Sequence, residues 1–276
     1  MIKLIATDMD GTFLDGNGQI DRARFSAILD QLDARDIPFV IASGNGMDRL
    51  LKLCQGFEDR LIFVSDNGAR VVEKGETRVR HILDRDLVAA ILDYFRGSWG
   101  EVCLMLANDQ TIFMQEGANQ PFAGSDLPIA PEQMQAFLDK MTFLADLSQL
   151  PAEQPIYKAG IWVEEDKVEV LTSAFNRAFE GRLTAVTSSY GSIDILPVGI
   201  HKAWGIEQVI QPLGITMAQV MAFGDSDNDL EMLAQAGYSY AMENATDRVK
   251  AVAKYRAPSH LDSGVLQVIE EFLQTH

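Results

Sequence analysis

Short apolar runs alternate with amphipathic segments through the first 65 residues, and the same rhythm returns after residue 197. Buried-strand patterns cover 3–7, 38–42 and 61–64 near the start, and 220–223 and 238–242 near the end. Apolar residues at helical spacing separate these runs. The alternation of strand and helix predicts a parallel sheet with helices on its faces.

Two segments carry the pattern of β-hairpins. The first covers residues 13–20 and contains the tight-turn sequence Asp-Gly-Asn-Gly at 15–18. The second covers residues 70–83, where apolar and polar residues alternate around a Lys-Gly pair. We expect a hairpin in each segment.

The pattern changes between residues 83 and 189, where helical segments are interspersed with short strand patterns. Helices are expected at 87–95, 131–141 and 167–179, and strands at 102–106, 111–114, 157–163, 183–187 and 192–196. This mixture predicts an α+β unit with an antiparallel sheet, inserted into the parallel-sheet domain. We therefore expect a discontinuous core domain of residues 1–82 and 190–276 and an inserted domain of residues 83–189.

The charge of the chain restricts its partners. Its 276 residues carry a formal net charge of −17, so we expect it to bind neither nucleic acid nor anionic membranes. A phosphorylated substrate would need a site built locally from a metal, a lysine and backbone amides. The N-terminus lacks a signal-peptide pattern, and no apolar stretch reaches the roughly 20 residues of a membrane span. We expect a cytoplasmic protein that is a monomer or a weak homo-oligomer.

Two carboxylates follow the first predicted strand. Asp8 and Asp10, within the sequence Asp-Met-Asp-Gly-Thr, lie where ligands bind in open α/β sheets. A carboxylate can attack phosphorus, and a second one can protonate a leaving alkoxide and then take a proton from water. A Mg²⁺ ion would relieve the repulsion between both acids and a phosphate. Taken alone, the pair is equally consistent with an acidic turn.

Polar residues also follow the second predicted strand and begin a later helix. Ser43 and Gly44 could hold a phosphate oxygen, although Ser-Gly is a common loop sequence and a plain turn is favoured for the pair alone. Lys202 could neutralise charge on a nucleophile and a phosphate. A lone lysine at a helix start, however, usually faces solvent.

An acidic cluster follows the strand predicted at 220–223. Residues 224–229 read Gly-Asp-Ser-Asp-Asn-Asp and include Asp225, Asn228 and Asp229. Three acids and an asparagine within five residues suit a site for a hard cation. A capped, acidic helix start needs fewer electronegative residues than this. The cluster therefore favours a cation site.

The four clusters together resemble the motifs of the haloacid-dehalogenase superfamily, and the resemblance covers essentially the whole chain. It implies a Rossmannoid α/β core with a parallel sheet and helices on both faces. It also implies that the long insertion, which lies between the second and third motifs, is an α+β cap domain of the C2 type. The segments Ser-Asp-Asn-Gly-Ala at 65–69 and Asp-Ser-Gly-Val at 262–265 are similar to loops of its Cof-type phosphatases.

The resemblance also implies roles for the candidate residues. Asp8 would be the nucleophile and Asp10 the general acid/base. Mg²⁺ would be held by Asp8, the backbone carbonyl of Asp10, and Asp225. Contacts with the phosphoryl group or with Asp8 would come from Ser43, the Gly44 amide, Lys202 and Asn228. Asp229 would support the metal and Lys202.

The second motif departs from the common Cof-type pattern. Many members carry Thr-Gly-Arg there, whereas this chain has Ser43-Gly44-Asn45, which is similar to a branch of bacterial sugar phosphatases. The departure removes a possible phosphate-facing arginine. We expect a Mg²⁺-dependent phosphatase that hydrolyses small phosphate monoesters, above all sugar phosphates, through a phosphorylated Asp8. A hexose phosphomutase is an alternative, and so is a catalytically idle binding module, although the complete set of motifs argues against the latter.

Overall fold

The computed structural model describes residues 1–119, 121, 131–187 and 191–275, which form two compact units. The first unit comprises Met1–Arg80 and Ile200–His276, and the second comprises His81–Gly199. The domain boundary expected at 82/83 differs by two residues. The boundary expected at 189/190 is ten residues too early, because the strand Ser192–Pro197 pairs with two strands of the second unit. Residues 189 and 190 themselves lie outside the described residues.

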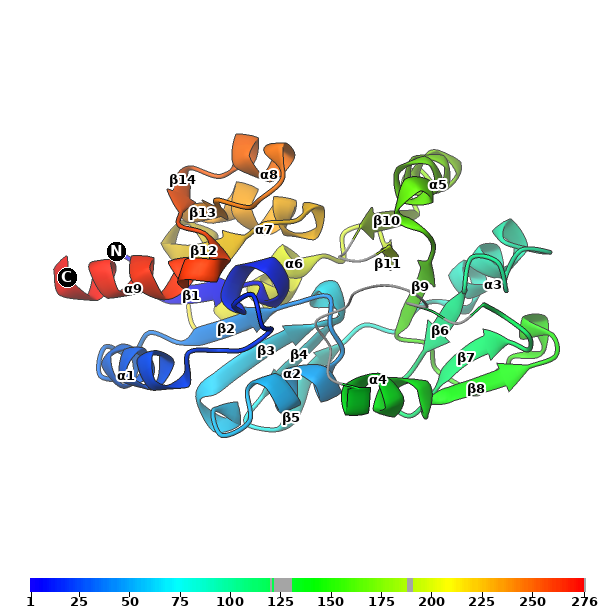
Figure 1. The fold of residues 1–276 in the computed structure, drawn as a ribbon, viewed down its shortest axis with the longest axis horizontal. Helices are drawn as coiled ribbons and strands as arrows, with labels where there is room; N and C mark the ends of the chain where they lie inside the picture. The colour runs from blue at the N-terminus through cyan, green and yellow to red at the C-terminus, as the bar shows by residue number, and fades with distance from the viewer. Residues whose placement is uncertain (120, 122–130, 188–190, 276) are drawn as a thin grey trace. The chain divides into compact units, whose positions relative to one another are not determined.

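The first unit is built on an eight-stranded sheet of order β14-β13-β12-β1-β2-β3-β4-β5 (Figure 1). The strands are β1 (Leu4–Thr7), β2 (Phe39–Ala42), β3 (Leu61–Ser65), β4 (Arg70–Glu73), β5 (Glu76–Arg80), β12 (Val220–Gly224), β13 (Tyr238–Met242) and β14 (Tyr255–Ala257). Adjacent strands from β14 to β3 are parallel, which confirms the predicted parallel sheet. The hairpin expected at 70–83 is β4–β5, which adds two antiparallel strands at one edge.

Helices cover the faces of this sheet. They are α1 (Arg22–Asp33), α2 (Met47–Leu53), α6 (Lys202–Ile210), α7 (Leu230–Gln235), α8 (Asp247–Val252) and α9 (Gly264–Thr275). Helix α1 packs against α9, and α6 packs against α7. The side chain of Asp21 caps α1 by accepting from the backbone N–H of Arg24 (3.2 Å). The apolar stripe that begins at Phe25 is buried, as its helical spacing predicts.

The hairpin expected over residues 13–20 is wrong. These residues, all of which the structure describes, form no strand. The segment Met9–Phe13 that leads into them is an irregular turn, in which Asp10 and Gly11 have non-helical backbone angles. The tight turn is present, since the N–H of Gly18 donates to the carbonyl of Asp15 (3.0 Å). Phe13 and Leu14 are both buried, and the Phe13 ring packs edge-on against Phe25 at 4.9 Å. Two consecutive buried residues cannot satisfy the in–out alternation of an exposed hairpin.

The second unit contains a six-stranded sheet of order β10-β11-β9-β6-β7-β8. Its strands are β6 (Met105–Ala107), β7 (Ile112–Gln115), β8 (Met141–Leu144), β9 (Lys158–Trp162), β10 (Leu183–Thr187) and β11 (Ser192–Pro197), and its helices are α3 (Arg85–Tyr94), α4 (Pro131–Leu138) and α5 (Glu165–Ala178). The sheet is antiparallel, as predicted, except that β7 and β8 are parallel. Apolar residues of α3 and α5 bury one face of it in a separate core. Among the described residues, no helix combines the length and apolar character that a membrane span requires.

Candidate active site

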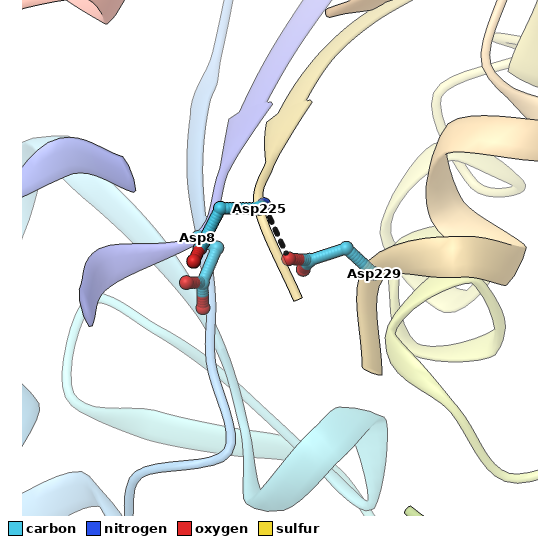
Figure 2. A group of neighbouring side chains, drawn as sticks. All are labelled: Asp8, Asp225 and Asp229. Carbon is cyan, nitrogen blue, oxygen red and sulfur yellow. Dashed lines mark hydrogen bonds between the residues drawn. The ribbon is translucent and has the colours of Figure 1, made fainter. Parts of the chain in front are cut away.

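Two neighbouring strands of the first sheet bring the predicted acids together. Strands β1 and β12 pair with Thr7 opposite Phe223, and the N–H of Asp8 donates to the Phe223 carbonyl (3.1 Å). Parallel strands end at the same sheet edge, so Asp8 and Asp225 emerge side by side. Asp229 completes a short 3₁₀ turn before α7. Oxygens of these three carboxylates lie within 4.8 Å of one another (Figure 2).

A buried lysine lies among these acids. Lys202 is the first residue of α6, which the His201 side chain caps by accepting from the N–H of Trp204 (3.1 Å). The Lys202 Nζ is 2.7 Å from Asp8 Oδ1 and 2.7 Å from Asp229 Oδ1, and its side chain is fully buried. The expectation that a lone lysine faces solvent does not apply here, because two carboxylates hold this side chain inward.

Burial and crowding perturb the acid group. Desolvation by burial raises the pKa of Asp8 well above its usual range, although the Lys202 charge opposes this rise. Burial, followed by the negative charge of Asp229, raises the pKa of Asp225 to about 6. Burial disfavours the charge on Lys202, but Asp229 and Asp8 outweigh it and raise the pKa of the lysine. Three carboxylates crowd one ammonium group, so full ionisation of the acids leaves an excess of negative charge.

This excess suits a divalent cation. Oxygen ligands and net negative charge are what Mg²⁺ requires in proteins. Asp229 uses one oxygen for Lys202, and its Oδ2 accepts from the amides of Asp225 (2.9 Å) and Ser226 (3.1 Å). Asp8 and Asp225 are therefore the members better placed to offer oxygens to a metal. In sequence these two residues are 217 positions apart, so the fold itself creates the pair.

Asp225 is held in place by residues of both strand ends. The Thr12 hydroxyl donates to Asp225 Oδ1 (2.8 Å), and the Ser226 hydroxyl donates to Asp225 Oδ2 (3.1 Å). Gly11 has a positive φ of 76°, and a Cβ atom there would lie 2.6 Å from Asp225 Oδ2. Glycine is thus required for this close approach. From the sequence we assigned no role to Thr12, although its place two residues after Asp10 in Asp-Met-Asp-Gly-Thr is a usable signal.

Asp10 lies outside the acid group and has partners of its own. Its Oδ1 accepts from the Arg49 guanidinium (2.6 Å), and its Oδ2 accepts from Asn45 Nδ2 (2.6 Å). Asn45 Nδ2 and the Asn45 amide also contact the Ser43 hydroxyl oxygen, at 3.0 and 3.1 Å. Gly44 lies between them in the loop after β2. In the sequence, Asn45 marks only the departure of the second motif from Thr-Gly-Arg, and nothing singles out Arg49.

Asn228 and the loop after β2 meet through a third segment. Asn228 is buried, and its Nδ2 donates to Asn67 Oδ1 (3.0 Å). Asn67 belongs to the turn after β3, has a positive φ of 53°, and donates its N–H to the Ser43 carbonyl (3.0 Å). Among the described residues, Asn228 Oδ1 is buried and has no hydrogen-bond donor. The turn therefore connects two of the predicted phosphate-binding residues.

The chain resembles known hydrolases along its whole length. The model of a family described as haloacid dehalogenase-like hydrolases matches residues 5–269. A 5-amino-6-(5-phospho-D-ribitylamino)uracil phosphatase of Escherichia coli, YbjI, is 33% identical over 99% of this chain and 97% of its own. An HMP-PP phosphatase of Serratia proteamaculans is 30% identical over 91% of this chain and 88% of its own. A crystal structure of a Streptococcus mutans protein superposes with a TM-score of 0.86, at 33% identity, covering 99% of this chain and 100% of that one.

Proposed function

Because this chain belongs to the haloacid dehalogenase-like hydrolase family, we propose that it hydrolyses small phosphate monoesters through a phosphorylated Asp8. Family membership and the named phosphatases among its relatives make it a phosphoric monoester hydrolase. The nucleophile, the metal and the substrate are our proposal. The observation that carries it is the contact of the buried Lys202 with Asp8 inside a group of three carboxylates.

Mg²⁺ is the metal that we assign to the acid group. Asp8, Asp225 and the backbone carbonyl of Asp10 would hold it. Asp229 would support this arrangement through its ion pair with Lys202 and its hydrogen bonds from the amides of Asp225 and Ser226. When bound, Mg²⁺ supplies positive charge that offsets the repulsion between the carboxylates and a phosphate dianion.

The residues of this chain divide the reaction between them. An Asp8 oxygen attacks phosphorus, forming an acyl phosphate, while Asp10 gives its proton to the departing ester oxygen. Asp10 then takes a proton from the water that attacks phosphorus, and Asp8 and inorganic phosphate are released. Lys202 balances negative charge on Asp8 and on the phosphoryl group.

The phosphoryl group would be held by residues from three loops. Ser43 fits this role because Asn45 donates to its oxygen, and neither contact uses the hydroxyl hydrogen. That hydrogen can bond a phosphoryl oxygen, and the Gly44 amide follows in the same loop. Asn228 fits because its side chain is buried beside the turn that carries Asn67. Lys202 completes the set.

A phosphorylated metabolite with a primary alkyl phosphate is the substrate class we favour. The E. coli relative is named for a compound with a phosphorylated ribityl group, which is a sugar-alcohol phosphate. Such an ester has a poor leaving group, so it needs the proton that Asp10 would provide. We propose that the second unit, residues 81–199, acts as a cap that excludes water and selects the leaving group.

A screen of phosphorylated metabolites, reading released phosphate, tests this function. We expect activity with Mg²⁺ on sugar and sugar-alcohol phosphates and loss of activity with EDTA. We expect no activity in Asp8→Asn, which should fold because Lys202 keeps its pair with Asp229. Asp227→Asn is the matched control, since Asp227 lies in the same turn as Asp229 but pairs with the exposed Arg248. Hydrolysis that persists in Asp8→Asn contradicts the nucleophile, and unchanged rates in EDTA contradict the metal. Isomerised product without phosphate release would favour a phosphomutase instead.

A further inference from the structure

Both oxygens of the Asp10 carboxylate are engaged by neighbouring side chains. Arg49 donates to Oδ1 and Asn45 donates to Oδ2, each at 2.6 Å. Two donors on opposite oxygens fix the plane of a carboxylate as well as its position. Asp10 therefore does not rotate freely in the site but is held in one orientation.

Arg49 owes its place to the start of α2. The helix begins at Met47, so Arg49 lies in its first turn, four residues after Asn45. In the part of the chain that the structure describes, Arg49 Nε is buried without a hydrogen-bond acceptor. The position of the guanidinium therefore favours the contact with Asp10 at the expense of one unpaired donor. A function at Asp10 explains this better than a contribution to folding does.

The ion pair is also poorly suited to stabilise the fold. The side chains of Arg49 and Asp10 are 24% and 25% exposed, and pairs this accessible to solvent contribute little to stability. The same two residues are joined through Asn45 to the hydroxyl of Ser43. The network therefore ties the proton-transferring carboxyl group to a residue that would hold the phosphate.

We propose that Arg49 is a positioning residue that holds Asp10 in line for proton transfer to poor leaving groups. This inference rests on the proposed role of Asp10 as general acid/base. Many Cof-type members have an arginine where this chain has Asn45. Arg49 lies four residues later and places a guanidinium group near the same loop. It acts through Asp10 and makes the enzyme competent on alkyl phosphates, whose leaving oxygen must receive a proton.

Kinetics on two esters test the inference. The probes are p-nitrophenyl phosphate, whose leaving group departs without a proton, and the best primary alkyl phosphate of the metabolite screen. The parameter is kcat/KM, which reports the steps up to formation of the acyl phosphate and not its hydrolysis, a step that both esters share. We expect Arg49→Gln to lower kcat/KM about 10- to 100-fold on the alkyl ester and less than about 3-fold on the aryl ester. Arg24→Gln is the control, because Arg24 makes a similarly short pair with Glu270 (2.7 Å) on helices α1 and α9. It should change neither rate.

A double-mutant cycle distinguishes the positioning role of Arg49 from the general acid/base role of Asp10 on which it rests. If Arg49 acts through Asp10, Asp10→Asn combined with Arg49→Gln should be no slower than Asp10→Asn alone. Equal losses on both esters in Arg49→Gln, additive losses in the double variant, or a raised KM at unchanged kcat would overturn the positioning role. If Asp10→Asn itself lowers kcat/KM of both esters equally, the general acid fails and the inference falls with it. If Asp10→Asn discriminates between the esters and Arg49→Gln does not, only the inference fails.

Discussion

Replacing Lys202 by methionine tests whether the acid group depends on this buried charge. Methionine keeps most of the side-chain volume, so the change removes the ammonium group without opening a large cavity. Its two contacts, with Asp8 and Asp229, are each 2.7 Å long. At an effective dielectric constant of about 20, each is worth about 6 kcal/mol of Coulomb attraction.

The net loss of stability is smaller than that sum. Removing the lysine also removes the desolvation cost of burying it, which is several kcal/mol. Breaking a buried ion pair by deleting one partner costs about 3–5 kcal/mol, and we expect Lys202→Met to lose that much free energy of unfolding near neutral pH. A Lys167→Met control, at an exposed pair with Glu164 of similar length (2.8 Å), should lose less than about 1 kcal/mol.

The loss should depend on pH. Burial already raises the pKa of Asp8, and Lys202 opposes that rise. Without the lysine the pKa of Asp8 rises further, so the folded variant binds more protons than its unfolded chain does. Its stability therefore falls as pH rises from the ordinary range of an aspartate through the raised value. The deficit relative to wild type should be largest at neutral pH and smaller at about pH 5.

Urea unfolding combined with peptide-resolved hydrogen exchange measures this loss of stability and assigns it to the first or the second structural unit. Protection of β1 and β12 reports the first unit, whereas β9 reports the second and should not change. Adding Asp229→Asn to Lys202→Met should recover part of the loss, because one unpaired charge disappears while an acceptor for the amides of Asp225 and Ser226 remains. A loss below about 1 kcal/mol, or no recovery in the double variant, would refute the electrostatic reasoning.

Three further predictions concern the metal, the backbone and the core. The pKa of Asp225 is raised to about 6 without metal, so this carboxyl group should be mostly protonated at about pH 5. Calorimetry should therefore find that Mg²⁺ binds about tenfold more weakly at about pH 5 than at about pH 7.5. Equal affinities would contradict this. Gly68→Ala places a Cβ 2.1 Å from the carbonyl oxygen of His201, at a residue whose φ is 101°, and should cost about 1–3 kcal/mol or more in urea unfolding. Gly75→Ala is the control, because Gly75 also has a positive φ but no atom lies within 4 Å of the added Cβ, and it should cost less. Equal losses in the two variants would exclude the collision. Phe25→Ala should lower the free energy of unfolding by about 3–5 kcal/mol, because the Phe25 ring packs against three other phenylalanine rings at centroid distances of 4.9–5.0 Å. A loss as small as that of a surface substitution would show that this cluster is not essential to the core.

The parallel sheet and its acidic residues could be predicted because they have local signatures. A buried strand in this fold is a continuous apolar run, and residues 220–223 and 238–242 nearly coincide with β12 and β13. Asp8 and Asp225 each follow such a run directly. Once the strands are assumed to lie in one parallel sheet, their ends must share an edge, so the contact between distant residues follows from local patterns.

The missed features depend on contacts that the sequence does not encode locally. Arg49 reads as an ordinary polar residue in a helix, and only the distance to Asp10 reveals its role. The turn at 15–18 gives the same signal as a hairpin, but burial of Phe13 in a tertiary cluster decides against strands. β14 is three residues long with two exposed, so it carries no apolar run. β8 has no fully buried residue, which explains why the helix expected at 131–141 was extended into it.

Detection of a phosphoryl group on Asp8 tests the central claim most directly. The wild-type enzyme and Asp10→Asn would be mixed with Mg²⁺ and excess p-nitrophenyl phosphate, whose leaving group needs no proton from Asp10. The reactions would be quenched in acid within the first turnover and digested for peptide mass spectrometry. We predict a phosphorylated peptide that contains Asp8, formed and consumed at rates that match turnover, and more abundant in Asp10→Asn because hydrolysis of the acyl phosphate is slowed. A rapid turnover with no phosphorylated Asp8, or with the phosphoryl group on another residue, would contradict the proposal.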